Sequence, residues 1–458
     1  MEAHILQIYW HESKPIYSLT FPTLSAYTSK NIHNDRLITC GGDKKIRVWK
    51  FNLKTKQVKD NPDIVLQTVD SIDFLSSLIG FEQAVNVIRF NNSTGDILAS
   101  AGDDGMVLLW KLCVENEEKN QNNTIFRSTD DDECKESWYI WKKLRAPHSS
   151  EIYDLCWSPD DKYIVVGCMD NTLKIFDVVQ GTFVFQTTNE GHCHYVQGVY
   201  WDPQDQYIVS MSADRAMCVY KIIRNNECNN NNNNIKELKL QKKVIKAEID
   251  HFMVSLFHNE TLPSFFRRLK FSPCGSLLIT PSGVMRQGTG NNNSTVNYIN
   301  TVYIFGRSNF KTPIGCIPNL PKPAIAIAFN PNFYEHSSNI TQSTIKLPYK
   351  LVFAVATVNQ VFIYDSANLA CIASVANLHY SPITDICWNP SGNIIMISST
   401  DGFISYITLN CGKLFGKKTS LNQFDLESKG TTPANIPDPF LKKNEMVPAI
   451  NILIPRKK

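Results

Sequence analysis

The chain alternates apolar and polar residues in short runs, and these runs recur in one frame. The first half of the frame is a run of five or six residues that ends in an aromatic, often followed by Ser, Asn or Asp, then Pro and a turn. Seven such runs occur, at residues 16–21, 85–90, 152–157, 196–201, 266–271, 325–329 and 383–388. Alternation with a period of two predicts strands with one buried face.

The second half of the frame is an apolar run, a turn that often holds Asp, and another run that closes on an aromatic residue. The closing aromatics stand at positions 49, 110, 176, 220, 305, 364 and 406. The shortest intervals, from 176 to 220 and from 364 to 406, match the period of about 40–45 residues of a four-stranded propeller blade.

These repeats predict an all-β fold, a seven-bladed β-propeller over residues 1–410. A single small antiparallel sheet cannot bury both of its faces, whereas stacked sheets bury each other's faces. The last repeat has three clear strands, and an unassigned alternating run at 4–9 precedes the first repeat. We therefore expect this N-terminal strand to complete the seventh blade and close the propeller.

Several segments depart from the blade pattern and are expected to be flexible. They are an acidic insertion at 115–137, Asn-rich loops at 225–234 and 288–297, and a basic tail at 411–458. The acidic insertion is either a solvated loop or a patch for a basic partner, with Asp130, Asp131 and Asp132 as contacts. In the tail, alternation over 447–454 predicts docking on a partner by strand addition, through Ile450 and Ile452.

Composition and motifs exclude several classes of function. Lys and Arg number 46 against 43 Asp and Glu, a net charge of +3, so we expect little direct DNA binding. The 13 cysteines are scattered without a C-x-x-C pair, as is typical of reduced thiols inside the cell. No apolar run is long enough to span a membrane, and hydrolase, nucleotide and metalloprotease motifs are absent. We predict no enzyme activity, cofactor or metal.

The repeats resemble those of the WD-repeat family in Gly191-His192, in the turn aspartates and in the closing Trp49 and Trp110. In that family, a histidine ahead of the first strand and the turn aspartate of the same blade join a hydrogen-bond network. The resemblance implies three structural pairs, which are His148 with Asp170, His192 with Asp214, and His379 with Asp401.

A closer resemblance is to the family of the middle WD-repeat subunit of chromatin assembly factor 1, of the fungal type. The segments that carry it are 7–11, 84–90, 96–105, 195–199, 262–268, 281–283, 347–354, 379–383 and 398–402. It implies a nuclear, non-catalytic scaffold in a histone chaperone that deposits histones three and four on newly replicated DNA. The implied partners are the large and small subunits, these histones and an anti-silencing histone chaperone.

Two other functions remain open. One is a replication-independent histone-regulation chaperone, which usually carries a long second domain after a similar propeller. The other is a substrate receptor of a ubiquitin ligase, which would have a helical module of the F-box kind ahead of the propeller.

The segment 263–268, Pro-Ser-Phe-Phe-Arg-Arg, is the clearest candidate for partner binding. Phe266 fits the buried side of the expected strand, whereas Phe265, Arg267 and Arg268 offer the aromatic and arginine side chains that dominate interfaces. We expect that replacing both arginines by Glu weakens complex assembly without unfolding the propeller.

Overall fold

The computed structural model describes residues 1–22, 36–58, 61–113, 134–188, 190–225, 234–249, 252–287, 297–336, 343–419 and 450–451. In these ranges the regular structure is almost entirely strand, with one short helix, α1 (Cys411–Phe415). None of these residues belongs to a helix long and apolar enough to cross a membrane. The chain divides into two compact units, residues 1–186 with 379–411, and residues 187–378 with 412–458.

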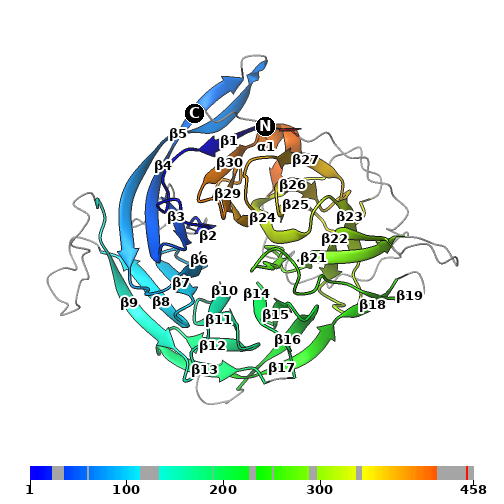
Figure 1. Cartoon of the computed structure of the whole chain (residues 1–458). Coiled ribbons are helices and arrows are strands. Elements are labelled where there is room, and N and C mark those ends of the chain that lie inside the picture. The colour runs from blue at the N-terminus through cyan, green and yellow to red at the C-terminus, as the bar shows by residue number, and fades with distance from the viewer. Residues whose placement is uncertain are drawn as a thin grey trace. The chain divides into compact units, whose positions relative to one another are not determined.

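The first unit contains four antiparallel four-stranded sheets (Figure 1). Three of them keep chain order: β2 (Ile16–Thr20), β3 (Arg36–Gly41), β4 (Lys45–Val58) and β5 (Asn61–Ile79); β6 (Val85–Phe90), β7 (Ile97–Gly102), β8 (Met106–Leu112) and β9 (Trp138–Arg145); β10 (Ile152–Trp157), β11 (Tyr163–Cys168), β12 (Leu173–Asp177) and β13 (Thr182–Gln186). The fourth joins β1 (Glu2–Leu6) to β28 (Ile383–Trp388), β29 (Ile394–Ser399) and β30 (Ile404–Thr408).

The N-terminal strand closes the last sheet, as the sequence predicts. β1 runs antiparallel to β30, from the pair Glu2 and Thr408 to the pair Leu6 and Ile404. Just after β1, Trp10 is fully buried, and its ring meets that of Trp49 edge-on at 4.7 Å. The first residues of the chain are thus bound by both backbone pairing and aromatic packing.

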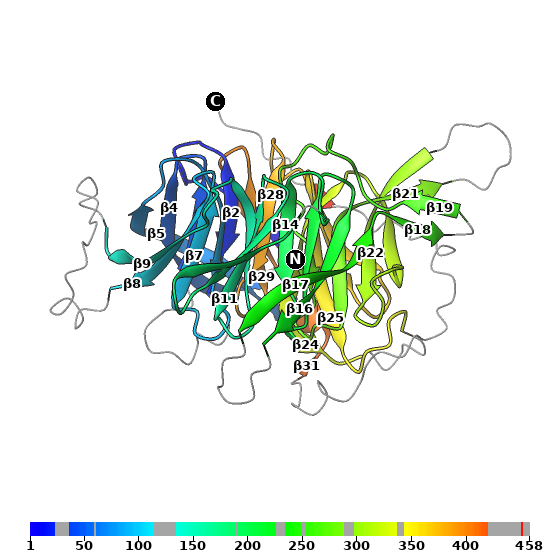
Figure 2. The ribbon, with the colours of Figure 1, turned by 90° about the horizontal axis from the view of Figure 1, so that it is seen from below.

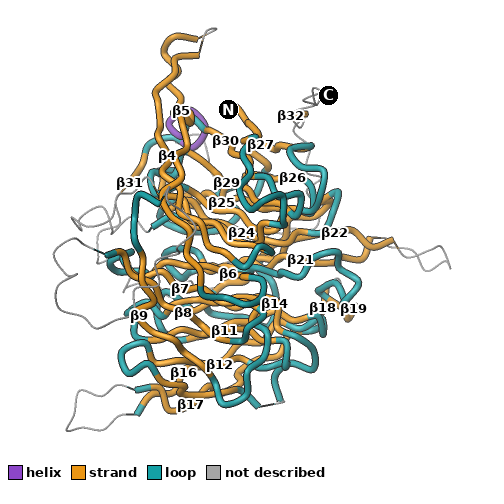
Figure 3. Tube along the Cα trace, turned by 60° about the vertical axis from the view of Figure 1, so that its left-hand side comes forward, coloured by secondary structure: helices purple, strands orange, loops and turns teal. Residues whose placement is uncertain are grey.

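The hairpin of β4 and β5 is much longer than the repeat predicts, with strands of 14 and 19 residues (Figure 3). Gln67 on β5 fastens it to the last sheet, because its side chain accepts a 2.6 Å hydrogen bond from Asn393. The hydroxyl of Thr408 on β30 also donates to the Gln67 carbonyl. The hairpin therefore reinforces the sheet that β1 completes.

The second unit contains three further sheets in chain order. They are β14 (Val196–Trp201), β15 (Tyr207–Ser212), β16 (Met217–Arg224) and β17 (Ile235–Val244); β20 (Lys270–Phe271), β21 (Leu277–Gln287), β22 (Asn297–Gly306) and β23 (Gly315–Leu320); β24 (Ala324–Tyr334), β25 (Lys350–Thr357), β26 (Gln360–Asp365) and β27 (Cys371–Ala376). A separate hairpin, β18 (Lys246–Ile249) and β19 (Phe252–Ser255), lies beside β21 (Figure 2).

Seven sheets of this kind confirm the predicted all-β, seven-bladed fold. Within each unit, apolar side chains of successive sheets meet in common clusters, such as Ile38 and Val48 with Leu98 and Trp110. Strands between two such clusters are buried on both faces, and every residue of β25 is buried. This is why those strands read as continuous apolar runs in the sequence.

Residues 411–419 differ from the expected flexible tail. They form α1 and the short strand β31 (Lys418–Thr419), which pairs with Phe333 and Tyr334 of β24. The ring of Phe415 is fully buried and lies 5.4 Å from that of Tyr334. Burial of this aromatic residue extends the folded region past the predicted boundary at 410.

The insertions fall mostly outside the described residues, namely 114–133, 226–233 and 288–296. The end of the acidic insertion is described and is fixed to the first sheet. The backbone N–H groups of Lys135 and Glu136 donate to the Leu75 carbonyl at 2.8 and 3.1 Å. Glu136 also accepts from Arg36 Nε at 2.9 Å, so this acid is part of an ion pair.

Candidate protein-interaction surface

His192 joins the loop before β14 to the turn between β15 and β16. Its buried ring places Nδ1 3.2 Å from both carboxylate oxygens of Asp214, and Nε2 2.8 Å from Ser210 Oγ. A carboxylate only accepts, so Nδ1 carries a proton and donates to Asp214. This network holds the loop against the turn.

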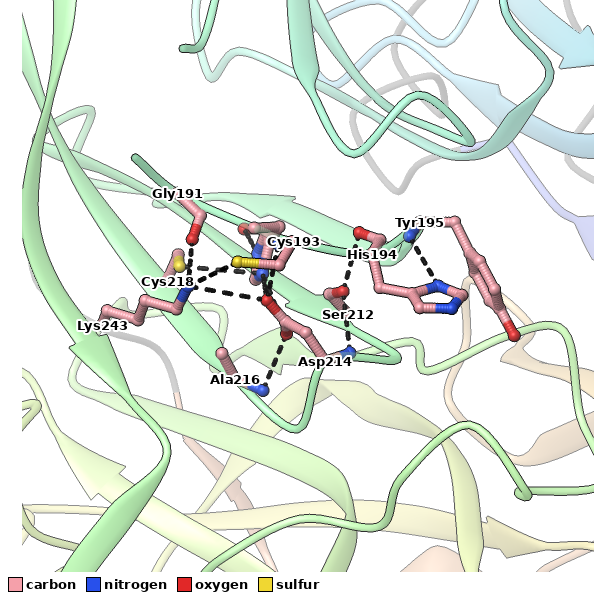
Figure 4. Close-up of polar contacts among 11 residues, drawn as sticks. Gly191, Cys193, His194, Tyr195, Ser212, Asp214, Ala216, Cys218 and Lys243 are labelled. Atoms are coloured by element: carbon pink, nitrogen blue, oxygen red, sulfur yellow. Dashed lines mark hydrogen bonds and ion pairs between the residues drawn. The ribbon is translucent and has the colours of Figure 1, made fainter. Parts of the chain in front are cut away.

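Asp214 is the centre of this network (Figure 4). Its carboxylate accepts the backbone N–H of Cys193 at 3.0 Å and of Ala216 at 2.9 Å, and Lys243 Nζ lies 3.7 Å away. Burial alone would raise the pKa of Asp214, but the bond from His192 and these N–H groups lower it from 3.8 to about 2. The charged form is therefore the one that the fold stabilises.

We expect Asp214→Asn to lower the free energy of unfolding by about 2 kcal/mol at neutral pH, because it removes charged hydrogen bonds. The pKa of Asp214 is lower in the folded chain, so its contribution is complete above about pH 4 and is lost as the pH falls toward about 2. Denaturant unfolding of both proteins at several pH values measures the difference. A difference that stays constant down to acidic pH would contradict this account.

His379 makes the same arrangement in the first unit. Its Nδ1 lies 3.1 Å from Asp401 and its Nε2 lies 2.7 Å from Ser405 Oγ. The arrangement again links a loop before a first strand to the turn of the same blade.

Sequence reasoning missed a further member of this class, His11. Its Nδ1 is 2.6 Å from Asp43 and its Nε2 is 2.8 Å from Thr39 Oγ1, which also accepts from Trp49 Nε1 at 2.9 Å. The separation of His11 and Asp43 is 32 residues, against 22 for His192 and Asp214. A sequence search that allowed a longer connection between the first two strands of the blade would have found His11 from Asp43, the turn aspartate, and Trp49, the closing aromatic.

The expected pair of His148 and Asp170 does not form, which corrects the sequence analysis. The His148 side chain is exposed. Lys174, which is buried, donates instead to Asp170 at 2.7 Å and to the His148 carbonyl at 2.8 Å. The Lys174 ammonium on β12 thus takes the place of the His148 imidazole. It holds the loop through the backbone carbonyl of His148.

Arg267 and Arg268 are not surface contacts, which is a second correction. Arg267 is fully buried, and its guanidinium donates to the carbonyls of His258, at 2.6 Å, and Asn259. Arg268 is 3% exposed and lies over the Phe266 ring at 4.1 Å. The expected alternation fails because β20 begins only at Lys270, and Arg268 instead forms an isolated parallel bridge with Ala326.

Phe265 is the member of this segment that reaches solvent. Its side chain is 62% exposed, whereas Phe266 is 2% exposed and belongs to the core. In the first unit, Tyr9 and Tyr380 are likewise exposed, next to the loops that His11 and His379 hold. Such aromatic side chains on fixed loops are typical of protein-binding surfaces.

A buried ionic cluster in the first unit was also missed. Arg89 on β6 donates to Ser18 Oγ at 2.7 Å and to Asp385 at 3.1 Å, and Ser18 donates to Asp385 at 2.7 Å. Asp154 lies 3.8 Å from Arg89. Burial opposes the charge, but these two carboxylates raise the pKa of Arg89. The cluster links first strands of four sheets and leaves Arg89 charged.

No group of His, Cys, Asp and Glu within the described ranges has the arrangement of a metal site. The sequence model described as the CAF1B/HIR1 beta-propeller domain matches residues 1–414. The chain belongs to the CAF1B/HIR1 β-propeller family.

Relatives from both branches of the CAF1B/HIR1 family are similar to this chain. The B subunit of chromatin assembly factor 1 from Saccharomyces cerevisiae is 46% identical, over 91% of this chain and 88% of that protein. The Schizosaccharomyces pombe protein of the same name is 36% identical, over 100% and 96%. Protein HIR1 of Candida albicans is 25% identical, over 84% of this chain and 40% of its own length.

The remaining candidates of this CAF1B/HIR1 chain lie in the insertion and the tail. Asp130, Asp131, Asp132 and Ile452 are outside the described residues. Ile450 begins the short strand β32 (Ile450–Asn451), which pairs in parallel with Val375 and Ala376 of β27. The two described residues of this segment therefore pair with a sheet of the chain itself.

Proposed function

We propose that this chain is the non-catalytic propeller subunit of a chromatin assembly factor 1 complex. The observation that carries the proposal is the 46% identity to the Saccharomyces cerevisiae relative from that complex, over nearly the full length of both chains. Similarity to HIR1 is lower and covers less than half of that protein, so a histone-regulation chaperone is the weaker candidate. A ubiquitin-ligase receptor has no supporting observation.

In this role the chain would act in the nucleus and hold other proteins together. Its partners would be the large and small subunits and histones three and four, with an anti-silencing histone chaperone as a further contact. Exposed aromatic residues on loops fixed by buried networks support such a scaffold. The net charge of +3 agrees with DNA contact made mainly by other subunits.

A tagged pull-down from nuclear extract at moderate salt, with partners identified by mass spectrometry, tests the proposal. Recovery of a large subunit rich in charged residues, a second small propeller and histones three and four is expected. Recovery of histone-regulation proteins or ubiquitin-ligase subunits in their place would overturn it.

Phe265 is our candidate contact for the large subunit. We expect Phe265→Ala to lower the recovery of that subunit about tenfold, as is common for a central aromatic anchor. The melting temperature should stay unchanged because the side chain is 62% exposed. Val179→Ala, at 66% exposure in the first unit, is a control. Equal recovery with both variants would dismiss Phe265.

A further inference from the structure

The hairpin of β18 and β19 and the outer part of β21 and β22 enclose an open cavity of about 460 Å³ in the second unit. The hairpin belongs to no blade, yet the backbone after it is fastened to β21. Val284 N–H donates to the Leu256 carbonyl at 2.8 Å, and His258 N–H donates to that of Ser282 at 2.9 Å. The walls of the cavity are therefore built on paired strands, and their spacing is fixed.

The mouth of this cavity carries exposed apolar side chains, and apolar side chains are buried beneath them. Val254 and Phe257 are buried at its base, whereas Met253 and Tyr298 are 66% and 64% exposed at the edge. The volume is in the range that accepts one or a few side chains of a ligand. Tyrosine and methionine are both enriched where proteins bind.

The fully charged residues that line the cavity are all basic. Arg215, Lys246 and Arg286 line it, and no Asp or Glu is among its lining residues. Beneath it, the buried Arg267 guanidinium binds the carbonyls of His258 and Asn259, whose residues form part of the wall. Burial lowers the pKa of Arg267 to about 10, and nearby Arg215 also lowers it. Cations thus surround the exposed apolar side chains of the mouth.

Three carboxylates in the described parts of the neighbouring segments do not line the cavity. Asp214 is engaged by His192 and by two backbone N–H groups, and Glu260 lies 3.7 Å from His194. Glu248 pairs with Met253 and therefore lies on the same face of the hairpin as Met253 and Lys246, although it is not itself a lining residue. The lining residues themselves therefore carry a net positive charge.

We propose that this cavity is a docking site for an acidic peptide segment of a partner protein, which inserts an aromatic or large aliphatic side chain. Carboxylates of the segment pair with Lys246, Arg286 and Arg215, and its apolar side chain packs between Met253 and Tyr298. A nucleic acid fits less well, because its backbone has no apolar group to place between Met253 and Tyr298. The site goes beyond the proposed function, since it does not depend on which complex contains the chain.

The test is fluorescence anisotropy with the purified full chain and a labelled peptide of about 12 residues, rich in Glu and Asp, with one central Phe. We expect saturable binding that weakens about tenfold when Phe is replaced by Ala in the peptide. The double variant Lys246→Glu with Arg286→Glu should also weaken binding about tenfold. Because only the purified chain is used, the result is independent of the pull-down.

The matched control is Lys239→Glu with Lys242→Glu, which makes the same charge change at exposed positions of β17. It should alter affinity by less than about twofold. Thermal melting verifies that both double variants are folded. Tyr298→Ala tests peptide binding in the same way, but removes the apolar contact instead of the charges. Absence of saturable binding, equal affinity of the two double variants, or preferential binding of a labelled DNA duplex at this cavity would overturn the proposal.

Discussion

Removing residues 1–10 should leave the chain without a stable fold. The deletion removes the strand that pairs with β30 from Glu2 to Leu6, and it removes the fully buried Trp10. The last sheet would then expose the edge of β30, and an unpaired strand edge favours aggregation. We expect loss of the cooperative thermal transition and poor recovery of soluble protein.

A pair of single substitutions separates packing from backbone pairing at this end of the chain. Trp10→Ala should cost about 3–5 kcal/mol, the usual range for a buried aromatic residue. Tyr9→Ala alters the preceding residue, which is 79% exposed, and should change stability by less than about 0.5 kcal/mol. Denaturant unfolding of both variants measures these values. Near-normal stability of the deletion or of Trp10→Ala would show that the N-terminal strand does not secure the last sheet.

The repeat pattern predicted the blades because each blade buries its strands in the same way. The alternating run at 383–388 is β28, and the aromatic at 406 lies in the middle of β30. The same sheet geometry selects the same residue types in every copy. The N-terminal strand was predictable for a related reason, because the last repeat lacked one strand.

Side-chain roles were less predictable because they depend on contacts between segments distant in sequence. Asp170 occupies the expected turn, yet Lys174 binds it in place of His148. The sequence does not distinguish the two, because an ammonium and an imidazole N–H can both donate to a carboxylate. His11 escaped notice because the long connection between β2 and β3 increases its separation in sequence from Asp43. The cavity beside β21 depends on a hairpin outside the repeat, which no blade pattern describes.

The structure changes the expected result of mutating Arg267. This side chain is fully buried and its guanidinium donates to two carbonyls, so Arg267→Glu would place a carboxylate against two acceptors. Breaking such a buried charged contact costs about 3–5 kcal/mol, and the reversed charge adds repulsion. We therefore expect Arg267→Glu to unfold the second unit, and any loss of partner binding by this variant would follow from that unfolding.

Comparison of three variants in the same segment tests this assignment. Arg267→Lys keeps the charge but loses the paired donors of the guanidinium, so it should unfold at a denaturant concentration between those of wild type and Arg267→Glu. Phe265→Ala should unfold as wild type does, because its side chain lies mainly in solvent. If Arg267→Glu melts like wild type and still fails to bind partners, the guanidinium acts at the surface and the buried contacts described above are wrong. If it unfolds while Phe265→Ala stays folded and binds weakly, Arg267 supports the loop and Phe265 is the residue that contacts the partner.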